Sequence, residues 1–384
     1  MRYQPFRAAA FFAATILLAA SAKAQPTPRP QDCTGKPGAD RNLQIKACTA
    51  LIEAAQGSPQ DRAKAYKSRA SAYFAIGDDD RAMADDDAAI RIDPNMASAY
   101  NGRGDIYMDR DDPDRAIAAY SQALQRDPKY VAAYTDRSYA YDQAGDFDRA
   151  LADANEAIRL NPKSAEAYTM RGNAYAYKGE IERALADYAE AIRVDPKGAS
   201  DAYAFRGLAY MAKGDFAHAA AAFSESVRID PQNMSAYFNR GRANLFAGAL
   251  PQAIEDYKRA IAITPGYPYA ALWLDIAEAR SKLPSTLPQA IAKLNMTKWP
   301  APVIRMYLGQ MKPAAVLAAA ADPNAAKQIG QVCEANFYSG EWVLRQGAKD
   351  EAARRFRVAA RDCPKTFFEA TAAALELKRL GATP

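Results

Sequence analysis

Small and aromatic residues recur with a helical spacing through the middle of the chain. Tyr66, Ala70 and Tyr73 are three or four residues apart, so they would share one face of a helix. A glycine follows, and the same spacing then returns in a second run, at Ala82, Asp86 and Ala89. Glycine permits the tight turn that two adjacent helices need. The pattern predicts a pair of helices joined by a short turn.

This helix pair returns every 34 or 35 residues. Six copies begin at Ala65, Ala99, Ala133, Ala167, Ala202 and Ala236. Each copy ends at a proline, namely Pro94, Pro128, Pro162, Pro196, Pro231 or Pro265. Proline cannot continue a helix and disfavours helical backbone in the residue before it. The middle of the chain is therefore an internal repeat of helix pairs, and we place its six units at residues 61–265.

The repeat resembles the tetratricopeptide repeat (TPR) family. The fourth copy follows that family's pattern throughout, at Tyr168, Gly172, Tyr175, Ala184, Tyr188, Ala191 and Pro196. Three positions in other copies depart from it, namely Asp86, Ala154 and Asn244. The resemblance implies an all-α fold, an α-solenoid of helix-turn-helix repeats in which first helices line a concave face.

The first 24 residues have the features of a cleaved secretory signal. Arg2 and Arg7 precede a short apolar run at residues 8–20, and the A-x-A site at 22–24 leaves Gln25 as the first mature residue. An uncleaved anchor is the alternative. Since no cysteine directly follows the apolar run, we do not expect a lipoprotein. Without the signal the formal charge falls from +5 to +2, which gives no argument for nucleic-acid binding.

The four cysteines are candidates for disulfides in an exported protein. Pairing of near neighbours, Cys33 with Cys48 and Cys333 with Cys363, is the favoured one of three connectivities. The first pair would staple a helical cap at residues 25–60. A catalytic thiol is the rival interpretation, and His218 is the only imidazole that such a thiol has as a base.

Residues 266–384 are expected to form a helical C-terminal module. A degenerate repeat keeps the family spacing at Gly340, Phe356 and Pro364, and Cys333 and Cys363 would lie at neighbouring ends of its two helices. A last helix at about 366–380 would cap the solenoid.

Three stretches of the chain, YAALWLDIAEAR, WPAPVIRMYLGQM and ANFYSGEWVLRQGAKDEAARRFRVAA, resemble the NlpI type of bacterial envelope TPR lipoprotein, although the lipidated cysteine is absent. That resemblance implies a periplasmic scaffold for proteases or peptidoglycan hydrolases, and a homodimer.

Every copy carries an arginine three residues after its first tyrosine, at Arg69, Arg103, Arg137, Arg171, Arg206 and Arg240. One hypothesis is a basic ladder for an acidic ligand. The favoured hypothesis is structural: the arginine's guanidinium would bind helix C-terminal carbonyls and the Asp or Asn before each closing proline. Those acceptors would be Asp93, Asp127, Asn161, Asp195 and Asp230.

The concave face is the expected binding site for a periplasmic protein or peptide. Its candidate residues are Asn101, Asp105, Tyr139, Asn173, Tyr177 and Arg242, with Asp142 beside them. The later copies are apolar there, at Phe205, Leu208, Met211, Phe238 and Leu245. Some TPR domains bind the C-terminal carboxylate of a peptide through a clamp of Lys and Asn side chains on successive first helices. By similarity, the clamp positions in this chain are occupied by Lys67, Ser71, Gly102, Ala132 and Asp136, and only Lys67 matches the family's residue types.

The charge pattern and the single histidine limit the kinds of metal site and catalytic site that we expect in this chain. Residues 78–115 hold twelve Asp against five Arg, while residues 281–331 are basic. The acidic clusters match no EF-hand spacing, so a solvated face is favoured over a calcium site. We expect no catalytic residue, metal, cofactor or membrane-spanning segment in the mature chain. The rival functions are an accessory of a polysaccharide or secretion apparatus and a hydrolase with paired carboxylates.

Overall fold

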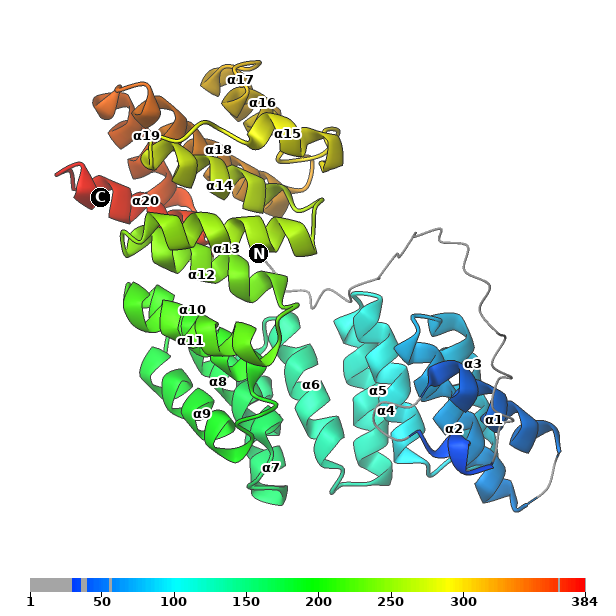
Figure 1. Ribbon diagram of the computed structural model, residues 1–384. Helices are drawn as coiled ribbons and strands as arrows, with labels where there is room; N and C mark the ends of the chain where they lie inside the picture. The colour runs from blue at the N-terminus through cyan, green and yellow to red at the C-terminus, as the bar shows by residue number, and fades with distance from the viewer. Residues whose placement is uncertain (1–29, 36–39, 55–56, 365–366, 384) are drawn as a thin grey trace. The chain divides into compact units, whose positions relative to one another are not determined.

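The computed structural model describes residues 30–35, 40–54, 57–364 and 367–383 (Figure 1). The described residues form helices and turns and contain no strand, which confirms the all-α solenoid of repeats. None of these helices is long and apolar enough to cross a membrane. The predicted signal at residues 1–24 lies outside the described residues. The chain divides into two compact units between Asp195 and Pro196.

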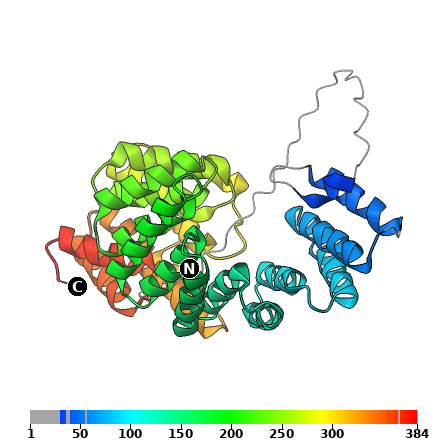
Figure 2. The same ribbon diagram turned by 90° about the horizontal axis from the view of Figure 1, so that it is seen from below.

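The first unit contains a short 3-10 helix, one leading helix and four helix pairs, which lie side by side (Figure 2). Its elements are η1 (Pro30–Thr34), α1 (Arg41–Glu53), α2 (Pro59–Ala75), α3 (Asp79–Ile92), α4 (Ala97–Asp109), α5 (Pro113–Arg126), α6 (Val131–Gln143), α7 (Phe147–Leu160), α8 (Ala165–Tyr177) and α9 (Ile181–Val194). Each first helix contacts its own partner and the next first helix, so α2, α4, α6 and α8 share one side of the unit.

Matched residue sizes hold the two helices of a pair together. A Cβ on Gly104 would lie 2.3 Å from the Tyr120 ring, and one on Gly172 would lie 2.6 Å from Tyr188. Glycine is therefore required where the second helix carries an aromatic ring, because the ring occupies the space of a side chain. In the first and third copies, where that aromatic is absent, the glycine is replaced by Ala70 and Ser138.

The recurrent arginines hold the repeats together, but their partners differ from those we predicted. Arg137 Nε and Nη2 donate to the two carboxylate oxygens of Asp153 at 2.7 and 2.8 Å, and Nη1 donates to Ser121 at 2.9 Å. One side chain thus links its own second helix to that of the preceding repeat. The same carboxylate pairing recurs in Arg69–Asp85, Arg171–Asp187 and Arg240–Asp256.

The residues before the closing prolines, which we predicted to accept hydrogen bonds from the arginines, instead bond to the backbone. Asp93, Asp127 and Asp230 each accept a hydrogen bond from the backbone amide two residues later, which stabilises the turn. In the second and fifth copies, Ala119 and Ala222 stand where the other copies carry the arginine's aspartate. These substitutions explain why the arginine has no aspartate partner in its own second helix in those two copies. Arg103 of the second copy instead lies 3.4 Å from Asp87, on the second helix of the preceding repeat.

The second unit begins with two more helix pairs and ends in a helical module. Its elements are α10 (Ser200–Ala212), α11 (Phe216–Ile229), α12 (Met234–Phe246), α13 (Leu250–Ile263), α14 (Pro268–Arg280), α15 (Leu287–Ala290), η2 (Ile291–Lys293), α16 (Ala301–Tyr307), α17 (Pro313–Ala319), α18 (Ala325–Arg345), α19 (Lys349–Asp362) and α20 (Phe368–Arg379). Helices α18 and α19 pack as a pair with Gly340 against Phe356, and α20 packs on both (Figure 1).

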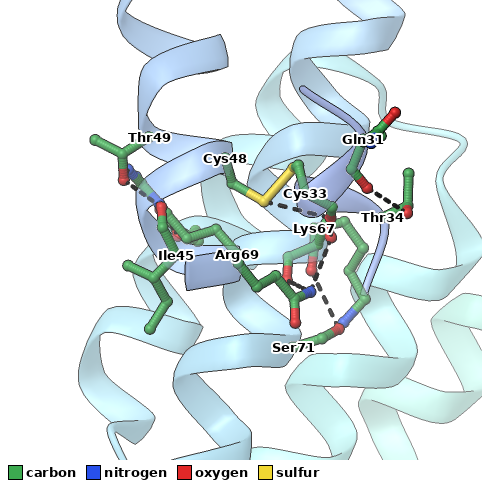
Figure 3. Close-up of a disulfide and its surroundings, with 12 residues drawn as sticks. Gln31, Cys33, Thr34, Ile45, Cys48, Thr49, Lys67, Arg69 and Ser71 are labelled. Carbon is green, nitrogen blue, oxygen red and sulfur yellow. Dashed lines mark hydrogen bonds and ion pairs between the residues drawn. A yellow bond between two sulfur atoms is a disulfide. The ribbon is translucent and has the colours of Figure 1, made fainter. Parts of the chain in front are cut away.

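Both disulfides join near neighbours in the sequence. Cys333 is bonded to Cys363 with an S–S distance of 2.06 Å, which ties α18 to the end of α19. Cys33 is bonded to Cys48 with an S–S distance of 2.13 Å, as Figure 3 shows. The carbonyl of Cys33 accepts a hydrogen bond from Ser68, so the stapled segment is anchored on α2.

Candidate binding face of the repeat helices

Five of the six candidate groove residues lie in the first unit, on its first helices. Asn101 and Asp105 belong to α4, Tyr139 to α6, and Asn173 and Tyr177 to α8. Neighbouring first helices contact one another, so these positions share one face of the unit. We call this surface the open face and define it by Asp105, Asp136, Tyr139, Asp142 and Tyr177.

The part of the open face between α4 and α6 is a network of carboxylates and donors. Asn101 Nδ2 donates to Asp136 Oδ2 at 2.8 Å, and the Tyr120 hydroxyl donates to Asp105 Oδ1 at 3.0 Å. Burial, and then the Asp105 carboxylate, raise the pKa of Asp136 to about 8, although the hydrogen bond from Asn101 opposes them. Asp136 does not match the carboxylate clamp in the sequence, and its carboxylate is instead paired with Asn101 of the preceding repeat.

Lys67 does not provide a clamp for a peptide carboxylate. Its ammonium lies 3.2 Å from Asp86 Oδ1, and Asp86 stands where four of the other five repeats have an aromatic ring. Burial raises the pKa of Asp86 to about 7, with Lys67 opposing that shift. The lysine is therefore engaged by a residue of its own repeat.

The part of the open face between α6 and α8 contains an isolated carboxylate. Asp142 is 9% exposed, and its buried Oδ1 has no hydrogen-bond partner among the described residues. Burial alone raises the pKa of Asp142 to about 7. Desolvation, and then the Asp142 carboxylate, raise the pKa of Tyr177 to about 12, and Asp142 acts on Tyr139 as well. Asp142 therefore lies near both tyrosines.

Tyr177 is held in place yet accessible. Its ring stacks on Phe147 with centroids 5.2 Å apart and planes 6° apart, while 45% of the residue remains exposed. The stack had no signal in the sequence, since the two residues belong to different repeats. Asn173, in contrast, is buried and accepts a hydrogen bond from the Tyr188 hydroxyl at 2.8 Å, so it supports packing.

Arg242 is not an open groove residue, and this corrects the sequence prediction. Its guanidinium carbon lies 3.4 Å from the ring centre of Phe368 on α20, and the residue is 7% exposed. Trp273 and Phe238 lie 5.6 and 5.4 Å from the same carbon. Burial lowers the pKa of the guanidinium. Spacing along α12 placed Arg242 on the concave side, but α20 covers that side.

Three of the five apolar positions predicted on the concave side of the second unit, Met211, Phe238 and Leu245, are buried, whereas Phe205 and Leu208 are half-buried. Met211 and Leu245 are 3% exposed. Phe368 packs against the cluster that contains Met211, and it lies 5.5 Å from the Phe246 ring. The C-terminal helix therefore occupies the side of this unit on which a ligand was expected.

The other candidate chemistry does not assemble into a site. His218 is exposed, with Nδ1 2.7 Å from Asp215 Oδ2 and its ring stacked on Tyr210. Over the residues that the structure describes, no group of three or more His, Cys, Asp or Glu side chains is arranged to hold a metal ion.

Comparisons with known proteins agree with the repeat architecture. Residues 101–165, 169–234 and 206–268 match the tetratricopeptide repeat family. A tetratricopeptide repeat protein from Parabacteroides merdae shares 17% identity over 62% of this chain and 92% of its own, with a TM-score of 0.51. The Cut9–Hcn1 hetero-tetramer of APC/C gives 16% identity over 62% of this chain and 49% of that chain, with a TM-score of 0.53.

A third structure, of MamA, shares 28% identity over 42% of this chain and 94% of its own, with a TM-score of 0.36. The likeness to the first two structures is one of fold. The 34-residue period, the stacked helix pairs and the family match together show that residues 101–268 contain tetratricopeptide repeats.

Proposed function

We propose that this protein is an exported, non-catalytic scaffold that binds other proteins on the open face. The observation that carries the proposal is the set Tyr139, Asp142 and Tyr177, which lies on the first helices and includes the buried Asp142, whose Oδ1 has no hydrogen-bond partner among the described residues. Stacked repeats present extended surfaces of this kind to peptides and proteins. A surface that contributes little to packing between repeats is suited to contacts with another molecule.

Two features support export to the periplasm. The N-terminal residues have the charged, apolar and A-x-A regions of a cleaved signal. The two disulfides are typical of proteins in oxidising compartments. The resemblance of the C-terminal module to NlpI-type proteins favours a periplasmic protease or a peptidoglycan hydrolase as the partner, together with a homodimer.

The test is crosslinking and affinity capture from a periplasmic extract, with the mature chain as bait. We expect one or more envelope proteases or cell-wall hydrolases to be captured, and the yield to fall at least fivefold with Tyr139→Ser/Tyr177→Ser. Asp114→Asn, an exposed change on the second helix α5, is the control and should leave the yield unchanged.

Two outcomes would replace the proposal. Capture of polysaccharide or secretion components, without a protease or hydrolase, would favour an accessory of such an apparatus. Turnover of peptidoglycan or protein by the purified chain, lost on a single Asp or Glu substitution, would make the protein a carboxylate-based hydrolase. Unchanged capture by the tyrosine variant would move the binding surface away from the open face.

A further inference from the structure

We propose that the open face binds a peptide segment that carries arginine or lysine side chains, one of which pairs with Asp142. This inference rests on the proposed function, because it names the chemistry of the partner that the scaffold would hold. Asp142 differs in its surroundings from the buried carboxylates that hold the repeats of the first unit together.

The buried carboxylates of the framework have cationic partners. Asp153 and Asp187 receive bidentate hydrogen bonds from Arg137 and Arg171, and Asp86 has Lys67. Burying a carboxylate without a partner is costly, so native structures satisfy such groups with few exceptions. Asp142 is 9% exposed, against 6% for Asp153 and Asp187, and its buried Oδ1 has no hydrogen-bond partner among the described residues. Asp86 Oδ1 also accepts no hydrogen bond there, but the Lys67 ammonium lies 3.2 Å from it. A cation from outside the chain would pair with Asp142.

The side chains around Asp142 suit an organic cation. The Asp142 charge contributes to the raised pKa of both Tyr139 and Tyr177. A group that contacts the carboxylate would therefore also contact aromatic rings. Guanidinium and ammonium groups bind favourably to aromatic faces, and guanidinium pairs with carboxylates through two parallel hydrogen bonds. The stack on Phe147 holds the exposed Tyr177 ring, which lowers the entropy lost on binding.

A second acidic group extends the surface across α6. Asp136 contacts Asn101 of α4, whereas Asp142 lies near Tyr177 of α8, so the two carboxylates face opposite neighbours of the same helix. Asp136 also experiences repulsion from Asp105. A bound segment that crosses α6 would therefore meet negative charge on both sides, which favours a ligand with more than one basic residue.

The test is fluorescence anisotropy with the mature chain and four labelled twelve-residue peptides in 150 mM salt. The peptides are identical except that every third residue is Arg, Lys, Gln or Glu. At this ionic strength long-range attraction is largely screened, so the comparison reports close contacts. We expect the Arg or Lys peptide to bind at least tenfold more tightly than the Gln peptide, and the Glu peptide not to bind.

Matched variants separate a specific site from general surface charge. Asp142→Asn should weaken the basic peptide at least tenfold, whereas Asp114→Asn, which makes the same charge change at an exposed position, should alter binding less than twofold. Circular dichroism and thermal melting confirm that each variant is folded. Equal losses in the two variants, or equal binding of the Arg and Gln peptides, would overturn the proposal.

Other occupants give distinct results. If the chain binds calcium and Asp142→Asn abolishes that binding, the site is a metal site and the peptide assignment is overturned. If the chain self-associates and Asp142→Asn alone disrupts the association, the occupant is a second copy of the chain and the peptide assignment is again overturned. If the peptides fail but the mature chain still captures its partner through Tyr139 and Tyr177, the scaffold function stands and the basic ligand is wrong.

Discussion

Equivalent positions of the two units differ in polarity and in exposure to solvent. Asp142 and Tyr177 belong to the first unit, and two repeats further along the chain their places are taken by Met211 and Phe246. Tyr177 is exposed, whereas Phe246 packs against Trp273 and Phe368. Both pairs of positions lie on first helices of a repeat, so the difference lies in the side chains and in the contact with Phe368 of α20 that the second unit adds.

This contrast shows how one repeat architecture yields both a core and a binding surface. An apolar face on repeated helices must be removed from water, and the second unit does this with its own C-terminal helix. A face with carboxylates and tyrosines gains little from burial by an apolar helix. The first unit therefore retains a surface with Asp142 unsatisfied, and the following experiments test this division.

The largest effect is expected from Cys333→Ser/Cys363→Ser. This disulfide closes 30 residues just before α20, and its loss should lower the free energy of unfolding of the second unit by about 3 to 4 kcal/mol. Hydrogen exchange should then show faster exchange in α12 and α14 and unchanged rates in α6. Unchanged protection of α12 would mean that the covering helix does not depend on the disulfide.

Arg171→Leu tests whether the framework is the same in both units. It leaves the carboxylate of Asp187 buried without its cation, so we expect urea unfolding to show a loss of about 2 to 3 kcal/mol. Arg206→Leu is the matched control, because Ala222 stands in place of that aspartate, and its cost should be below about 1 kcal/mol. Lost partner binding with unchanged stability in Arg171→Leu would instead favour a ligand-binding ladder.

Phe368→Ala and Phe147→Ala compare the covered face with the open one. Phe368 contacts Arg242, Trp273 and Phe246, so its truncation should destabilise the second unit by about 2 kcal/mol. Phe147 stacks on the exposed Tyr177 ring, and its truncation should cost about 1 kcal/mol or less. Thermal melting measures both, and equal losses would contradict the division.

Asp142→Asn should stabilise the protein slightly, and in a pH-dependent way. Its pKa rises from 3.8 to about 7 on folding, so the folded chain binds more protons between these values and stability falls as pH increases. The variant lacks this penalty, and at pH 8 it should be more stable by about 1 to 2 kcal/mol. The difference should vanish near pH 4. A loss of stability in the variant at pH 8 would indicate that the Asp142 carboxylate has a stabilising partner.

Local signals determined much of this protein. The period of small and aromatic residues, the turn glycines and the closing prolines each act within a few residues, so they predicted the helix pairs directly. The disulfide pairs follow the same logic, since near neighbours in a stapled hairpin are brought together by the hairpin itself. The match between Gly172 and Tyr188 is also readable, because one repeat contains both residues.

Contacts between distant residues were decided by the tertiary structure. The sequence placed an arginine in every repeat, but its aspartate, sixteen residues later, was recognisable only once the two helices were packed. Arg242 and Phe368 belong to segments with no shared period, so no pattern along α12 could reveal that α20 covers it. The lack of a hydrogen-bond partner for Asp142 Oδ1 also depends on how the helices pack, because the sequence does not show which donors lie within hydrogen-bonding distance.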